Sequence, residues 1–211
     1  MKLIDIHTHL LPLVKGSAIV NCSPASFIPQ FGMWYSVGFH PWFIGNDISS
    51  MNWADFEVSV THPQVLAVGE AGLDKLAEAP LALQIEVFKR QAIWADRLHK
   101  PLIIHLVKAV DSLLKLKQEL RPKVPWIIHG FRGKEQQADM LVRHGFYLSL
   151  GEHFQEKVLA SIPMDRLFLE TDERNISIEM LYERVALLRG CSSEEVYECI
   201  GKNICAVFFK H

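Results

Sequence analysis

Short apolar runs alternate with longer amphipathic segments along most of the chain. Each run has about the length of a strand, and most are hydrophobic without a break, as strands covered on both faces are. The runs are LIDIH from Leu3, AIVNC from Ala18, YSVGFH from Tyr35, VLAVGE from Val65, PLIIH from Pro101, PWIIH from Pro125, FYLSLG from Phe146 and LFLETD from Leu167. This pattern predicts eight buried strands.

The segments between many of these runs repeat their apolar residues at intervals of three and four, which is typical of amphipathic helices. The longest extends from Ala82 to His99. Another, from Ile178 to Arg189, is followed by Gly190, a residue that commonly ends a helix. Ser192 and Ser193 then provide the N-terminal cap of a last helix. Further helices are expected over 110–120, 134–144 and 155–161.

Strands that alternate with helices predict a parallel α/β fold, either a closed barrel or a doubly wound sheet. The alternation is irregular at the start, because the run from Leu3 and the run from Ala18 are too close for a helix and two turns. Either the first helix is missing or AIVNC is not a barrel strand. No linker, low-complexity tract or repeat interrupts the sequence, so we expect a single domain over 1–211.

The composition is that of a globular protein, with 211 residues, 49% of them hydrophobic and 22% charged. A formal net charge of -2 gives no global electrostatic argument for nucleic-acid binding, although a local basic patch would serve. Asp5, His7 and His9 interrupt the apolar N-terminal run, and no other run is long enough to span a membrane. We therefore expect a cytoplasmic protein with no membrane partner and no obligate protein partner.

Residues that can bind a metal stand at the ends of five of the predicted strands. In a parallel α/β fold the carboxyl ends of all strands lie on one side, where such folds place their active sites. His7 and His9 also share one face of their strand, with Asp5 one layer deeper. The residues at the strand ends are His7, His9, Glu70, His105, His129 and Asp172.

Four imidazoles and two carboxylates suit zinc or a similar divalent ion, with manganese, magnesium or iron as alternatives. Six ligands exceed one tetrahedral site, so the set predicts two ions about 3.5–4 Å apart with Glu70 as the bridging carboxylate. Asp172 is a candidate to accept the proton of the attacking water. Each residue alone would more often be structural, and it is their combination at five strand ends that favours a metal centre.

The segments HTH, SVGFHPW, VGEAGLD, PLIIH, IIHGF and LETD, in this order, resemble the TatD-like hydrolases over essentially the whole chain. That family is a metal-dependent branch of the amidohydrolase-like barrels, and its members are often described as deoxyribonucleases. The resemblance implies a distorted TIM-type (β/α)8 barrel, here without its first helix. It also implies two divalent ions, hydrolysis of phosphodiester bonds such as those of DNA, and the same six metal ligands.

The chain departs from the family pattern at three places, all where a substrate would be held. Val107, followed by Lys108, stands where the family commonly has Arg, and the loop after His129 reads Gly130-Phe131-Arg132 in place of Cys-Phe-Ser. After Asp172 the family continues with a small residue and Pro, and this chain has Glu173-Arg174-Asn175. The chemistry is thus better defined by the sequence than the substrate is.

Several residues beside the strand ends are candidates for holding the substrate. His40 is either a substrate contact or a structural residue, and Lys108 and Arg132 are either phosphate partners or solvated surface charges. Trp42 and Phe131 either stack on a base or pack at the barrel rim. Glu170 shares a face with Asp172 and is a candidate to hold a ligand in place.

The leading hypothesis is therefore a two-metal phosphodiesterase acting on DNA, in which Asp172 and Glu70 organise the attacking water. The first alternative is an amidohydrolase-type enzyme for a small amide, lactone or phosphoester, which the altered loops favour. The second is a metal-binding interaction module without catalysis, against which the intact ligand set argues.

Overall fold

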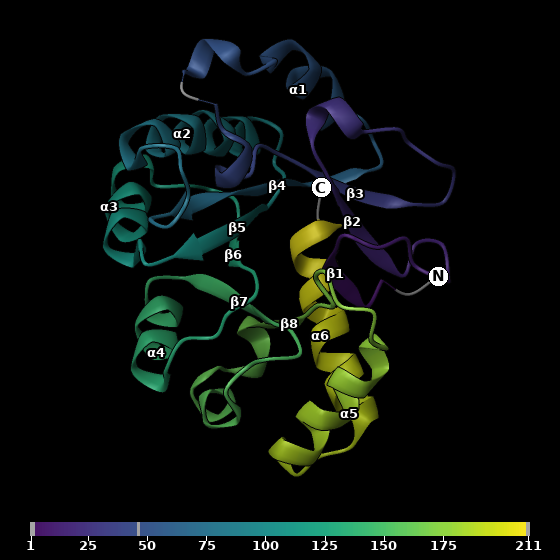
Figure 1. Cartoon of the computed structure of the whole chain (residues 1–211). Coiled ribbons are helices and arrows are strands. Elements are labelled where there is room, and N and C mark those ends of the chain that lie inside the picture. The colour runs from purple at the N-terminus through teal and green to yellow at the C-terminus, as the bar shows by residue number, and fades with distance from the viewer. Residues whose placement is uncertain (1–2, 46, 210–211) are drawn as a thin grey trace. The chain divides into compact units, whose positions relative to one another are not determined.

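The computed structural model describes residues 3–45 and 47–209 and contains one sheet of eight strands in the order β1 to β8 (Figure 1). The eight predicted strands are all present, with small shifts at their ends. They are β1 (Asp5–Thr8), β2 (Ala18–Cys22), β3 (Trp34–Val37), β4 (Val65–Asp74), β5 (Leu102–Val107), β6 (Trp126–Ile128), β7 (Phe146–Leu150) and β8 (Leu167–Leu169).

The first strand also pairs with the segment that follows the last strand. Thr8 and Asp172 form a parallel bridge, in which the amide of Asp172 donates to the carbonyl of His7 at 3.0 Å. The amide of His9 in turn donates to the carbonyl of Asp172 at 2.9 Å. The sheet therefore closes on itself, and the fold is the expected parallel β/α barrel.

The α-helices are α1 (Trp53–Val60), α2 (Leu81–Arg97), α3 (Val110–Leu120), α4 (Glu135–Arg143), α5 (Ile178–Arg189) and α6 (Ser193–Phe208). Helices α1 to α4 each connect two consecutive strands, whereas α5 and α6 both follow β8. No helix stands between β1 and β2, so the prediction of a missing first helix is confirmed, and AIVNC is a barrel strand.

Two further connections are reduced. Between β2 and β3 only the 3-10 turn Pro24–Ser26 forms, which the sequence did not predict. The helix expected over 155–161 is a 3-10 helix, Glu156–Ser161, rather than an α-helix. Conversely, α1 was not foreseen, since its mostly apolar sequence lacks a clear polar face.

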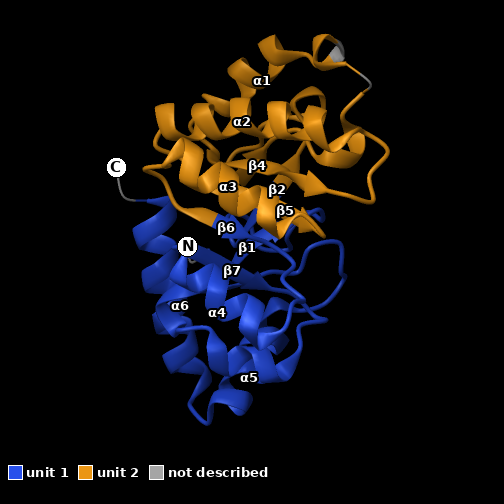
Figure 2. Cartoon of the chain, turned by 90° about the vertical axis from the view of Figure 1, so that its left-hand side faces the viewer, with its two compact units in different colours: residues 1–20, 127–211 blue, residues 21–126 orange. Residues whose placement is uncertain are grey.

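The contacts of the chain fall into two compact units (Figure 2). Unit 1 comprises residues 1–20 and 127–211, and unit 2 comprises residues 21–126. The boundaries cut through β2 and β6, so both units contribute strands to the sheet. The single domain over 1–211 stays a prediction.

Within unit 2, the long strand β4 carries the VGEAGLD motif and is buried along its whole length. The motif needs its second glycine, because a Cβ on Gly72 would lie 2.0 Å from the carbonyl oxygen of His105 on the paired strand β5. Helix α2 packs against β4 and turns Gln84 and Gln91 into the interior. Both glutamines hydrogen-bond to backbone near the candidate site.

Within unit 1, α5 and α6 pack against each other and against β8 (Figure 1). Helix α5 ends at Gly190, whose φ of 65° is in the left-handed region that glycine favours. Helix α6 begins with a capping box in which Ser192 and Glu195 satisfy each other's backbone amides, as the serines in the sequence predicted. No helix in the described part of the chain has the length and hydrophobicity needed to cross a bilayer.

Candidate metal centre

In unit 1, two histidines and an aspartate lie close together at the seam, the place where β1 pairs with the segment that follows β8. His7 lies on β1 and is fully buried, His9 follows the strand directly, and Asp172 follows β8. The Nε2 atoms of His7 and His9 each lie 3.7 Å from Oδ1 of Asp172. Two imidazoles and one carboxylate thus converge on one point.

The backbone at Asp172 is held in an unusual conformation. Its φ of 57° is in the left-handed region, which an L-residue adopts only when its surroundings enforce it. The surroundings do so here, through the backbone bonds to His7 and His9 and through the hydroxyl of Thr8, which donates to the carbonyl of Asp172 at 3.2 Å. The hydrogen bonds between β1 and the segment after β8 therefore orient the carboxylate of Asp172 toward His7 and His9.

A buried polar network lies beneath this seam. The hydroxyl of Thr171 donates to Oδ2 of Asp5 at 2.7 Å and to the hydroxyl of Thr8 at 3.0 Å. The amide of His7 donates to Oδ1 of Asp5 at 3.2 Å. Burial raises the pKa of Asp5 to about 7, despite these hydrogen bonds, which lower it. The network links the strand that carries His7 and His9 to the segment that carries Asp172.

His129 follows β6 and is held by Glu170, which is fully buried. Nδ1 of His129 lies 3.2 Å from Oε1 of Glu170, and the same oxygen accepts the amide of Gly130 at 2.6 Å. Burial alone would raise the pKa of Glu170, but the neighbouring His129 and His7 outweigh it and lower that pKa. An ionised Glu170 fixes the proton on Nδ1 of His129, which leaves Nε2 with a lone pair for a cation.

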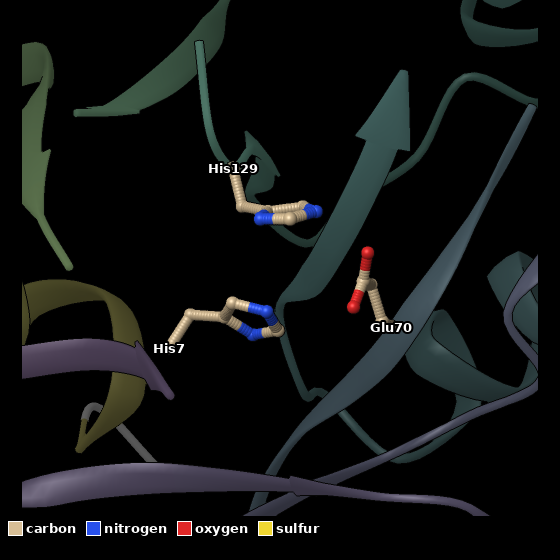
Figure 3. Close-up of side chains that lie close together, drawn as sticks. All are labelled: His7, Glu70 and His129. Carbon is tan, nitrogen blue, oxygen red and sulfur yellow. The ribbon is translucent and has the colours of Figure 1, made fainter. Parts of the chain in front are cut away.

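The rings of His7 and His129 lie together within unit 1, with centroids 4.3 Å apart (Figure 3). Together with His9 and Asp172, they give unit 1 four of the six predicted ligands. Figure 3 also labels Glu70, which β4 of unit 2 carries.

Unit 2 contains a second cluster, formed around Glu70. Oε1 of Glu70 lies 3.0 Å from Nδ1 of His105 on β5 and 3.2 Å from Nε2 of His40, which follows β3. All three side chains are mostly buried. The structure thus brings the predicted ligands Glu70 and His105 together, and places the substrate candidate His40 beside them.

Two residues that the sequence did not assign hold this cluster in place. Oδ1 of Asn21 accepts the amide of Glu70 at 2.8 Å, and Oδ2 of Asp74 lies 3.1 Å from Nε2 of His105. Burial alone would raise the pKa of Asp74, but the indole of Trp42, the amide of Leu76 and His105 outweigh it and lower that pKa. Asp74 could have been found, since it closes VGEAGLD at an even spacing from Glu70 and so shares its strand face.

His40 is oriented by a hydrogen bond from the backbone of Trp42 and by Gln91 of α2, which bonds to the preceding residue. Its Nδ1 accepts the amide of Trp42 at 3.1 Å, so a neutral His40 carries its proton on Nε2, toward Glu70. Gln91 fixes the preceding residue, accepting the amide of Phe39 at 2.7 Å and donating to its carbonyl at 3.2 Å. His40 therefore presents an N–H group, which suits an anionic oxygen better than a metal ion.

The other substrate candidates differ in exposure. Lys108, directly after β5, and Arg132, in the loop after β6, are both exposed. Trp42 is 59% exposed, whereas Phe131 is only 5% exposed. Phe131 therefore has the packing role, and Trp42 is the aromatic residue that a ligand can reach.

The donor atoms of both clusters have a spacing that suits a metal ion. Two ligand atoms bound to one tetrahedral zinc ion at about 2.0–2.1 Å lie about 3.3 Å apart. Glu70 and His105 meet this spacing in unit 2, and His7, His9 and Asp172 lie close to it in unit 1. The groups His7-His9-Asp172, His129-Glu170-Asp172 and His40-Glu70-His105 each offer ligand atoms within 4.8 Å of one another. The residues of each cluster thus fit a divalent ion in ligand type and in spacing.

Two relatives of this chain have names that describe a metal-dependent hydrolase and a nuclease. The chain is 30% identical over 195 residues to the "Uncharacterized metal-dependent hydrolase YabD" of Bacillus subtilis, covering 82% of this chain and 76% of that protein. It is 34% identical over 155 residues to the "3'-5' ssDNA/RNA exonuclease TatD" of Cronobacter turicensis, covering 67% of this chain and 57% of that protein.

The fold matches that of solved structures over its full length. The TatD homolog YJJV from Escherichia coli superposes with a TM-score of 0.78 at 20% identity, covering 99% of this chain and 97% of that one. The sequence model of the family described as "TatD related DNase" matches residues 26–209. The predicted resemblance is confirmed, and a metal-dependent nuclease fits these findings. The chain belongs to the TatD related DNase family.

Proposed function

We propose that the chain is a two-metal phosphodiesterase that hydrolyses DNA strands. The residues that would hold the two ions are His7, His9, His129 and Asp172 of unit 1 and Glu70 and His105 of unit 2. One observation carries the proposal. Each unit by itself brings imidazole and carboxylate atoms to metal-ligand spacing, with Asp172 near two histidines in unit 1 and Glu70 near His105 in unit 2.

Two carboxylates that contact proposed metal ligands, Glu170 and Asp74, support the assignment of His129 and His105 as ligands. Glu170 fixes the proton of His129 on Nδ1, and Asp74 fixes that of His105 on Nε2, so the other nitrogen of each ring is available to a cation. A histidine that only packs in a core needs no such partner of opposite charge.

When bound, the two ions would activate a water molecule and stabilise the charge that develops on the phosphate. The side chains of this protein move the proton and hold the phosphate. Asp172, held at the closed seam, accepts the proton of the attacking water. His40 donates from Nε2 to an oxygen of the phosphate, because its Nδ1 is occupied by the amide of Trp42.

Lys108 and Arg132 are the proposed cationic partners of neighbouring phosphates. Lys108 stands next to the position where the family commonly has Arg, and its backbone φ of 53° turns the chain sharply at the end of β5. The loop of Arg132 is fixed by Gln155, whose amide donates to the carbonyl of Arg132 at 2.8 Å. Both side chains are exposed and free of ion pairs among those that the described residues form.

The names of the relatives support a nucleic-acid substrate, since several are described as nucleases of DNA or of single-stranded DNA and RNA. The test is a substrate panel with the metal-loaded chain: single- and double-stranded DNA, RNA, a phosphate ester, a carboxylic ester, a lactone and a small amide. We expect hydrolysis of DNA that stops on chelation. Cleavage of only the small amide or lactone would instead support an amidohydrolase-type activity, which the Val107 substitution favours.

Zinc as the resident metal and a cytoplasmic location are parts of the same proposal. Zinc is supported by the four imidazoles among the six ligands. The location is supported by the four cysteines, which are thiols, since disulfides are uncommon in reducing compartments. Metal analysis of the purified protein and fractionation of the producing cells test the two points.

A further inference from the structure

Trp42 combines a firmly held indole nitrogen with an exposed ring. Its Nε1–H donates to Oδ2 of Asp74 at 2.6 Å, and its backbone amide donates to Nδ1 of His40 at 3.1 Å. Nevertheless, 59% of the residue is exposed. We propose that the exposed face of Trp42 is a stacking site for an unpaired nucleobase of the substrate strand, an inference that rests on the proposed function.

The ring is held rigidly because its anchor is rigid. Asp74 is buried at the end of β4, and its other oxygen accepts the amide of Leu76 at 2.7 Å. Its backbone is fixed by Gln84 of α2, which accepts the amide of Asp74 at 2.7 Å and donates to its carbonyl at 2.8 Å. An aromatic ring that is fixed before binding loses little conformational entropy when a ligand stacks on it.

The ring also lies beside the cluster around Glu70. Its centroid is 5.1 Å from that of His40 and 5.8 Å from that of His105. In a nucleotide only the sugar separates the phosphate from the base. A phosphate at His40 and His105 therefore places its base within reach of Trp42.

The chemistry of the surface identifies the ligand class. A flat aromatic face stacks on a nucleobase of any kind, because every base has a π-face. In a duplex the base would already be paired and stacked. The geometry therefore favours a single-stranded end, whose terminal base is free to turn onto the ring.

Neighbouring aromatic residues lack this combination. Phe131 is buried, and Phe43, although exposed in the same 3-10 helix as Trp42, has no polar atom that could fix its ring. Phe31 is also exposed in unit 2, but it precedes β3 and so lies toward the amino end of that strand, away from the ligands. Phe31→Ala is thus a matched control for Trp42→Ala.

The test is a binding scan with a phosphorothioate decathymidylate, which resists hydrolysis, measured by fluorescence anisotropy with the metal-loaded chain. The same oligonucleotide is prepared with one abasic residue at each position in turn. For the wild-type chain we expect one abasic position near the strand end to weaken binding by about tenfold, which is typical of a lost base–aromatic stack.

In Trp42→Ala we expect this penalty to vanish at that position, while Phe31→Ala keeps it. Trp42→Phe, which retains a ring but not the N–H group, should keep part of it. An identical abasic profile in the wild type and in Trp42→Ala, or a flat profile in the wild type, overturns the stacking site alone. A wild-type chain that neither binds nor hydrolyses single-stranded DNA overturns the proposed function as well.

Discussion

Glu170 lies 3.2 Å from Nδ1 of His129 and is completely buried, so the two form a fixed carboxylate–imidazole pair. The pair explains why a glutamate precedes Asp172 by two residues. It holds the ring of a ligand, whereas Asp172 itself faces His7 and His9. Such outer carboxylates orient metal-bound imidazoles and increase their basicity.

Glu170→Gln should weaken metal binding by about 10- to 100-fold, because the neutral amide no longer fixes the proton on Nδ1 of His129. The affinity for Zn²⁺ is measured by competition with a chelating dye. Glu173→Gln, at an exposed position three residues later, is the control and should bind as the wild type does. Equal affinities of Glu170→Gln and the wild type would remove Glu170 from the site.

Gln91→Leu should lower the free energy of unfolding by about 1–3 kcal/mol, because it leaves the half-buried amide of Phe39 without its acceptor. Urea unfolding followed by circular dichroism measures the change. Gln118→Leu, exposed on α3, provides the control and should change stability by less than about 0.5 kcal/mol. Similar values for the two variants would show that Gln91 does not fix the turn before His40.

Gly72→Ala should destabilise the protein by about 3 kcal/mol, since the added Cβ would overlap the carbonyl of His105 and force β4 and β5 apart. The unfolding midpoint in urea is the measurement. In Gly151→Ala the new Cβ meets its nearest atom at 3.6 Å, an ordinary contact, so that variant should unfold close to the wild type. Equal stability of Gly72→Ala and Gly151→Ala would contradict the close approach of β4 to β5 at Gly72.

Cys22 should be the slowest cysteine to be alkylated at pH 8, because burial raises the pKa of its thiol to about 11 and the thiolate is the reactive form. Its rate should still increase as the pH rises from 8 to 11. Peptide mass spectrometry after timed iodoacetamide treatment compares it with Cys205, which is exposed. Faster labelling of Cys22 than of Cys205 at pH 8 would contradict the partial burial of the Cys22 thiol.

The sequence predicted the strands and the ligand residues well for a physical reason. Strands of a closed parallel sheet are buried on both faces, so each is a continuous apolar run, and the polar residue that ends it stands out. His105, His129 and Glu70 were found in this way. The first helix was also correctly predicted to be missing, since the distance between two apolar runs can be read directly.

The residues that hold the ligands were harder to find. Asn21 and Gln91 act through side-chain contacts to residues distant in the sequence, and no local pattern specifies such partners. The exposure of the aromatic side chains could not be predicted from the sequence either. Trp42 and Phe131 both follow a strand, and only the folded chain shows that Trp42 is exposed and Phe131 is buried. The reduced connection between β2 and β3 escaped prediction because its polar and proline residues fit a loop or a helix start equally well.

The most direct test of the central claim is a metal titration of DNA hydrolysis. The chain is stripped with a chelator, refilled with known equivalents of Zn²⁺ or Mn²⁺, and incubated with a 5′-labelled single-stranded oligonucleotide. We predict no cleavage without metal, full cleavage only after two equivalents, and no cleavage by Asp172→Asn at any metal content. Hydrolysis that survives chelation, or is unchanged in Asp172→Asn, would contradict the account.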